Sequence, residues 1–175
     1  SADLDAVSAF ACFWQGDPSA ALRHAERALE TIGDSGGGMA QSLATLYRIG
    51  AMPRLGRHDE AFRIVDTAIR RELSRGSGRL PLLSIVRATL QLYDNDLDDV
   101  AATVRRWLAA EASTPPYWAV HAPYLLGVVA LEQDRPEEAE EYFQEVGAFR
   151  YLTNSRLFTD SLIGLALVAE RRSDR

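Results

Sequence analysis

The chain has 175 residues, 47% hydrophobic and 25% charged, an ordinary composition for one globular domain or one short solenoid. Its formal net charge of −6 argues against a basic face that grips nucleic-acid phosphates. No apolar run approaches the roughly 18 residues that span a bilayer, and no signal peptide is recognisable. We therefore expect a cytoplasmic protein without direct nucleic-acid or membrane binding. The first residue, Ser1, suggests a processed or excised piece.

The predicted elements are all helices, because apolar residues recur with a helical period and strand-like alternation is absent. Pro18 and Pro136 fall at helix starts, where a missing N–H costs nothing. Pro53 falls late in the third helix and should kink it or end it early. In chain order the helices are expected near residues 3–15, 18–32, 39–55, 59–75, 80–93, 97–112, 117–133, 136–148 and 155–171.

A period divides these helices into units. Turn positions recur at intervals of 40, 39 and 39 residues, and one more interval of 39 leads to Ser173. The turn positions are Gly16, Gly56, Asn95 and Asp134. A fixed period of roughly 20–50 residues is typical of solenoids, in which each unit buries its apolar face on its neighbours. We predict one all-α helix–turn–helix repeat solenoid domain of about nine helices in four and a half units, near 1–37, 38–78, 79–115, 116–153 and 154–175.

Two sets of residues resemble known proteins. The spacings from Gly16 to Ala21 and from Gly56 to Ala61 resemble the tetratricopeptide repeat, which implies a right-handed superhelix. The stretch from Tyr124 to Arg172, with Tyr-Leu-Leu-Gly-Val-Val-Ala-Leu-Glu-Gln-Asp-Arg-Pro-Glu-Glu-Ala-Glu-Glu-Tyr-Phe at its start, resembles the helical repeat region of the large ATP-dependent LuxR-type transcriptional activators of the maltose-regulator-like group.

The second resemblance implies a sensor segment that binds an inducer or a regulatory protein. In that family the repeats lie between a nucleotide-binding module and a DNA-binding helix-turn-helix. This chain has no Lys, so it holds no Gly-x-x-x-x-Gly-Lys phosphate loop. ATP and DNA binding would therefore belong to other segments.

Tetratricopeptide geometry implies a concave groove, lined by residues about 13, 10, 6, 3 and 2 positions before each turn. Polar and aromatic side chains at such positions suit a small polar ligand. The alternative is a groove wall without a ligand. The groove residues selected on this basis are Tyr93, His121, Tyr124 and Asp160.

A second candidate feature lies eight residues before the turns. Arg48 and Arg87 occupy this column, which is apolar in later units, and Gln91 follows Arg87 by one helical turn. A buried Arg needs a partner. One interpretation is an anionic ligand or partner carboxylate held by both Arg side chains. The other is pairing with internal acids such as Asp66 or Asp94.

Signs of catalysis or metal binding are weak. Cys12 lies in an apolar run and is expected to be a small buried side chain. The three His residues lack the i, i+4 spacing of a zinc helix, and no nucleophile–base pair or carboxylate dyad stands at usable spacing. We therefore expect no metal site, no cofactor and no enzyme activity.

The favoured hypothesis is the ligand-sensing or protein-interaction region of a bacterial transcriptional regulator, which binds an inducer or partner in its groove. The alternative is a generic protein–protein interaction scaffold without a small-molecule ligand. An enzyme is the weakest hypothesis. The last helix has no following partner helix, so its apolar face predicts either self-association through the C-terminal partial unit or marginal stability at the C-terminus. Residues expected on that face are Leu162, Leu165 and Val168.

Overall fold

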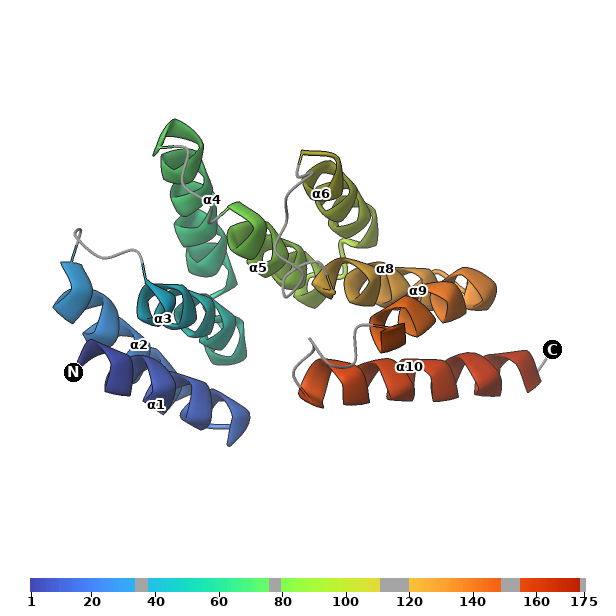
Figure 1. The fold of residues 1–175 in the computed structure, drawn as a ribbon, viewed down its shortest axis with the longest axis horizontal. Coiled ribbons are helices and arrows are strands. Elements are labelled where there is room, and N and C mark those ends of the chain that lie inside the picture. Colours follow the sequence, from blue (N-terminus) through green and yellow to red (C-terminus); the bar gives the residue numbers. More distant parts are fainter. Residues whose placement is uncertain (34–37, 76–79, 111–119, 149–154, 174–175) are drawn as a thin grey trace. The chain divides into compact units, whose positions relative to one another are not determined.

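The computed structural model describes residues 1–33, 38–75, 80–110, 120–148 and 155–173. Over these residues the chain is all-helical, with nine α-helices, one short 3-10 helix and no strand (Figure 1). Within the same residues, no helix combines the length and apolar character needed to cross a membrane. The elements are α1 (Ala2–Trp14), α2 (Pro18–Ile32), α3 (Met39–Ala51), η2 (Pro53–Leu55), α4 (His58–Arg75), α5 (Leu80–Tyr93), α6 (Leu97–Ala110), α8 (His121–Glu132), α9 (Pro136–Ala148) and α10 (Ser155–Ser173).

The predicted all-α class is confirmed, and the helix boundaries lie close to those expected from the sequence. The largest shift is at Pro53: α3 ends at Ala51, and Pro53 begins the 3-10 helix η2. The predicted early end of this helix is therefore confirmed. Its cause is that proline lacks the N–H that would continue the α-helical hydrogen bonds. The expected helical residues 111–112 and 117–119 lie outside the described part of the chain.

All four predicted turn positions close a helix in the same way. Each has a positive φ, between 55° and 83°, and two of them are not glycine. At the first turn Gly16 N–H donates to the carbonyl of Phe13, and Asp17 N–H donates to that of Cys12. The other three turns repeat this pair of hydrogen bonds, with N···O distances from 2.8 to 3.2 Å. In each, the turn residue donates to the carbonyl three residues before it, and the next residue donates to the carbonyl five residues before itself. This is the Schellman arrangement, so the sequence period is also a period of backbone geometry.

The described chain divides into two compact units, Ser1–Leu90 and Gln91–Arg175. In the first unit α1 and α2 form a hairpin, and α3 packs against both of its helices (Figure 1). Three alanines, Ala6, Ala28 and Ala44, form a buried cluster between these helices. Small side chains at these positions allow close approach of the helix backbones.

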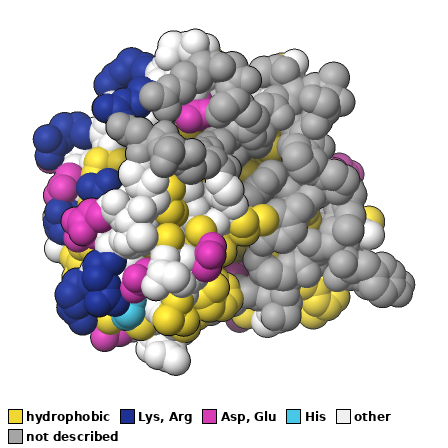
Figure 2. Space-filling view, turned by 60° about the vertical axis from the view of Figure 1, so that its left-hand side comes forward, with side chains coloured by type: hydrophobic (Ala, Val, Ile, Leu, Met, Phe, Trp, Pro, Cys, Tyr) yellow, Lys and Arg dark blue, Asp and Glu magenta, His cyan; other side chains and the backbone are white. Residues whose placement is uncertain are grey.

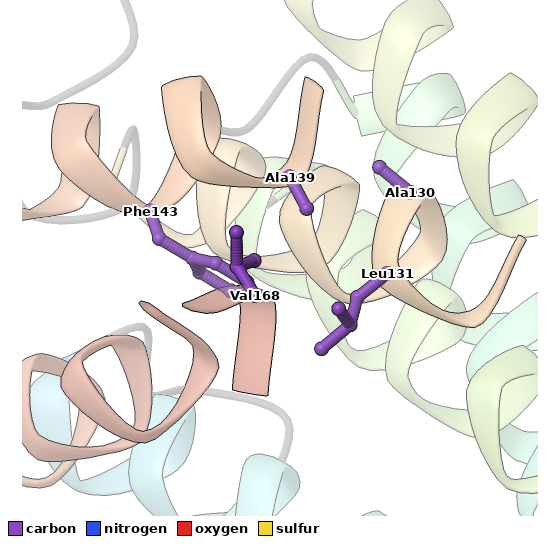
Figure 3. Close-up of a cluster of buried hydrophobic side chains, with 5 residues drawn as sticks. All are labelled: Ala130, Leu131, Ala139, Phe143 and Val168. Carbon is purple, nitrogen blue, oxygen red and sulfur yellow. The ribbon is translucent and has the colours of Figure 1, made fainter. Parts of the chain in front are cut away.

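In the second unit α10 packs against both helices of the α8–α9 hairpin. A buried cluster holds the three helices together, with Phe143 of α9 and Val168 of α10 side by side (Figure 3). Two glycines face the ring of Phe143. A Cβ atom would lie 2.8 Å from that ring at Gly127 of α8 and 2.6 Å from it at Gly164 of α10. Phe143 therefore fills a space that only glycines leave open.

The face of α10 that stays uncovered differs from the predicted one. Val168 is buried in the Phe143 cluster and Leu165 packs against it, so the placement of both on a free face was wrong. Leu162 is exposed as predicted, together with Ile163 and Leu167. The error came from assigning the whole apolar surface of α10 to a missing following helix, when one side of it packs on α8 and α9.

Candidate functional site

The first unit presents a group of aromatic side chains that are only partly buried. Phe10 and Trp14, one helical turn apart on α1, remain 44% and 39% exposed. The aromatic surface, as we call it, comprises these two residues with Arg54 and the buried rings of Phe13 and Tyr47. Large apolar rings held at a surface are typical of protein-binding sites.

Contacts among the rings fix the exposed pair in place. The ring centroids of Phe10 and Tyr47 lie 5.5 Å apart, and those of Phe13 and Trp14 lie 5.1 Å apart, both edge to face. Phe13 and Tyr47 also touch, at 5.3 Å. Aromatic pairs at such separations add about 0.5–1.5 kcal/mol beyond area burial. The exposed rings therefore rest on a rigid base and lose little freedom on binding.

Arg54 brings a positive charge to the same surface. Its guanidinium carbon lies 4.0 Å from the centre of the Phe13 ring, and Nη1 donates to the carbonyl oxygen of Phe13 at 3.3 Å. Arg54 belongs to η2, the 3-10 helix that begins at Pro53. The early end of α3 thus places this cation against α1, where it stacks on an aromatic face.

Figure 2 shows basic, acidic and apolar side chains side by side on one face, with a histidine among them. A shallow depression of about 340 Å³ lies on α2. Its lining comes from that single helix: Arg23, His24, Glu26, Arg27 and Glu30. A hollow formed between long side chains of one helix does not enclose a ligand, so it is a poor candidate for small-molecule binding.

Asp5 of α1 contacts two of the residues that line this depression. Its Oδ1 lies 3.0 Å from His24 Nδ1 and accepts a hydrogen bond of 2.8 Å from Arg27. The hydrogen bond to His24, with the bond and charge of Arg27, holds the pKa of Asp5 below its ordinary value of 3.8. These contacts tie α1 to α2.

This arrangement predicts an acid-sensitive contribution to stability. Because the pKa of Asp5 is lowered on folding, the contribution is fully present above pH 3.8 and is lost as the pH falls through the folded value. We expect Asp5→Asn to lower the melting temperature at neutral pH. The difference from wild type should shrink toward zero below pH 3.8, measured by circular dichroism. An equal difference at all pH values would contradict the assignment.

The two Arg residues predicted to hold an anion each lie beside an acid of the preceding helix–turn–helix repeat. Arg87 donates to Asp66 of α4 at 2.9 Å, and Arg48 lies 3.9 Å from Glu26 of α2. Both acids stand ten residues after a turn, and both Arg residues stand eight before the next. In the later units neither the Arg nor the acid is present at these positions. This geometry favours the interpretation that the pairs join successive units.

The remaining predicted residues lie in the second compact unit. Gln91 is buried, and its Oε1 accepts from the hydroxyl of Thr103 at 3.0 Å, which joins α5 to α6. Tyr93, at the end of α5, is exposed. Tyr124 is half-buried and its ring contacts Phe143 at 6.4 Å. His121 and Asp160 are half-buried on α8 and α10. A single groove through all seven predicted residues stays a prediction.

Two other expectations concern reactive groups. Cys12, expected to be buried, is a free and partly exposed side chain. Across the described ranges, no group of three or more His, Cys, Asp or Glu side chains is arranged to hold a metal ion.

Sequence reasoning missed the aromatic surface. Trp14 and Arg54 share the column two residues before the turn from which only Tyr93 was selected. Phe10, six residues before its turn, carried a usable signal, because it stands one helical turn from Trp14. Tyr47 gave no signal, because its contact with α1 depends on how α3 packs.

No family model, no curated protein and no solved structure matches this chain. The functional argument therefore rests on its own residues. The resemblance to the regulator family stays a prediction.

Proposed function

We propose that this chain is a protein-interaction domain that binds a segment of a partner protein on its aromatic surface. The observation that carries the proposal is the exposure of Phe10 and Trp14 beside Arg54, on a base of buried rings. Trp, Tyr and Arg are the side chains most enriched at the energetic centres of protein interfaces. A binding role is favoured over a catalytic one.

The chemistry of the surface suggests the kind of segment it takes. Two exposed rings offer apolar area, and the guanidinium of Arg54 adds a positive charge on an exposed side chain. An apolar side chain would pack on Trp14 and Phe10, and a neighbouring acidic side chain would pair with Arg54. We propose a short segment with an apolar residue next to an acidic one.

As the wider arrangement we propose a tetratricopeptide-like solenoid. Three observations support it: the identical turns, the packing of α3 on the α1–α2 hairpin, and the packing of α10 on the α8–α9 hairpin. The Arg–acid pairs between successive units add to this support. In such a fold each unit contacts only its neighbours.

The setting that we propose is the one implied by the resemblance: the sensor or interaction region of a cytoplasmic bacterial transcriptional regulator. Binding would shift the equilibrium between the resting and active forms of the whole protein. That shift can be no larger than the difference in the partner's binding free energy for the two forms.

The test is selection of binders from a displayed library of random peptides. We expect enriched peptides that pair an apolar with an acidic residue. Trp14→Ala should weaken their binding by about tenfold or more, the effect of removing a central aromatic side chain. The matched control is Leu108→Ala on α6, which removes another exposed apolar side chain and should leave binding unchanged.

Two outcomes would contradict the proposal. One is the absence of any enriched peptide; the other is a peptide whose affinity Trp14→Ala does not change. If peptides fail but a sugar or small carboxylate raises the melting temperature, and Tyr93→Ala abolishes that rise, the small-ligand hypothesis replaces this one.

A further inference from the structure

A second apolar feature of α1 lies outside the aromatic surface. Leu4 and Val7 are 66% and 55% exposed, although both are aliphatic and stand on a regular helix. They occupy the positions twelve and nine residues before the turn at Gly16. Aliphatic side chains exposed one turn apart mark a face that lacks a packing partner.

The corresponding positions are buried in the first helix of each later repeat, which is α3, α5, α8 or α10. At Ala44, Tyr47 and Gly164 the cover comes from the preceding repeat unit, which supplies Ala6, Phe10 and Phe143 respectively. In a solenoid such columns form the contact between successive repeat units. Buried residues twelve positions before a turn are Ala44, Leu83, Ala122 and Ser161. Those nine positions before are Tyr47, Val86, Leu125 and Gly164. Leu4 and Val7 thus belong to a face that is covered wherever the repeat continues.

The opposite kind of face is free on α10. Ile163 and Leu167 are 53% and 42% exposed, at ten and six residues before Ser173. The same columns on α1 hold Ala6 and Phe10. There Ala6 shares a buried cluster with Ala44, and the ring of Phe10 lies 5.5 Å from Tyr47. These columns therefore contact the columns twelve and nine before the next turn.

We propose that two copies of this chain associate head to tail, with α10 of one copy against α1 of the next. Ile163 meets Leu4, as Ala6 meets Ala44 within the chain, and Leu167 meets Val7, as Phe10 meets Tyr47. Each copy carries one surface of each kind, and both are apolar. The contact continues the α1 part of an interface that the fold already uses, which within the chain also includes Ala28 of α2.

A head-to-tail contact is heterologous, which distinguishes it from an ordinary dimer. Because each copy keeps one free surface of each kind, association continues into open chains or closes into a ring. This inference goes beyond the proposed function: its contact residues are Leu4, Val7, Ile163 and Leu167, and it requires neither Trp14 nor Arg54.

The test is sedimentation equilibrium of the chain and of two double variants. We expect the average mass of the wild type to rise with concentration, beyond that of a dimer. Leu4→Glu with Val7→Glu should be monomeric, and so should Ile163→Glu with Leu167→Glu. Mixed in equal amounts, the two variants should form dimers and nothing larger, because the first keeps an intact α10 and the second an intact α1.

The matched control is Leu73→Glu with Leu108→Glu, which charges exposed apolar residues on α4 and α6 and should associate like the wild type. If a glutamate variant loses helicity, serine variants at the same four contact positions replace it in the sedimentation test. A wild type that stays monomeric would overturn the proposal, as would a variant that associates alone or a mixture that stays monomeric. Peptide binding is measured on the monomeric Leu4→Glu, Val7→Glu variant, so the two proposals fail separately.

Discussion

Replacing Phe143 with alanine is expected to lower the free energy of unfolding by about 3–5 kcal/mol, the usual range for a fully buried Phe. The ring is only 1% exposed and lies among side chains of α8, α9 and α10. Its loss would leave a cavity that the neighbours cannot close, because Gly127 and Gly164 have no side chains to move into it. Urea unfolding followed by circular dichroism measures the change.

Phe10→Ala is the matched control, because it makes the same change at an exposed ring in the other compact unit. Surface substitutions usually alter stability much less than core ones. If the two variants were equally stable, the packing of Phe143 described above would be wrong.

Gly164→Ala should also destabilise the protein, although alanine is the better helix former. The new methyl group would lie 2.6 Å from the Phe143 ring, well inside contact distance. Gly127 approaches the other side of the ring, which therefore has no room to retreat. Overpacking costs about 1–3 kcal/mol, against a gain of about 1 kcal/mol in helix propensity. We expect a net loss, seen as a lower midpoint in urea.

The control for this change is Gly147→Ala in α9, where an added Cβ would meet nothing within 4 Å. There the gain in helix propensity stands alone, so stability should rise. A partial rescue of Gly164→Ala by Phe143→Leu would show that the two sites are coupled. Stabilisation by Gly164→Ala itself would contradict the close contact.

The helices and turns were predictable because the signal is repeated. One Gly at position 16 is weak evidence, but four turn residues at intervals of 40, 39 and 39 residues, each after an apolar helical run, reinforce one another. Asn95 and Asp134 illustrate the value of the period. Asparagine and aspartate tolerate a positive φ but do not require one, so neither residue alone predicts a turn. Their place in the period identified them as turns.

The packing between helices was much less predictable. The column nine residues after the turn reads Ala25, Val65, Val104 and Phe143, which the sequence presents as one class of core position. Only the structure shows that the bulky fourth member is matched by glycines on two other helices. Such complementarity depends on which residues meet across helices, and a one-dimensional pattern does not contain it.

The candidate site was likewise predictable only in part. The Arg column was visible in the sequence, and pairing with Asp66 was one of its two interpretations. The aromatic surface depends on the contact of Tyr47 with α1 and on the position of Arg54 in η2, beyond the end of α3. Both are consequences of tertiary packing, so neither could be derived from helix periodicity alone.

Phe143 has one further consequence, for how the end of the chain opens. Its ring is carried by α9 but lies beside Val168 of α10 (Figure 3). It also lies against Gly164 of α10 and Gly127 of α8. The middle of α10 cannot separate without uncovering that ring, so fraying from the terminus stops there. We therefore expect the amide protons in the middle of α10, around Gly164, to exchange with solvent only when α8 and α9 also open. The last helix thus unfolds together with the hairpin before it, as one cooperative element.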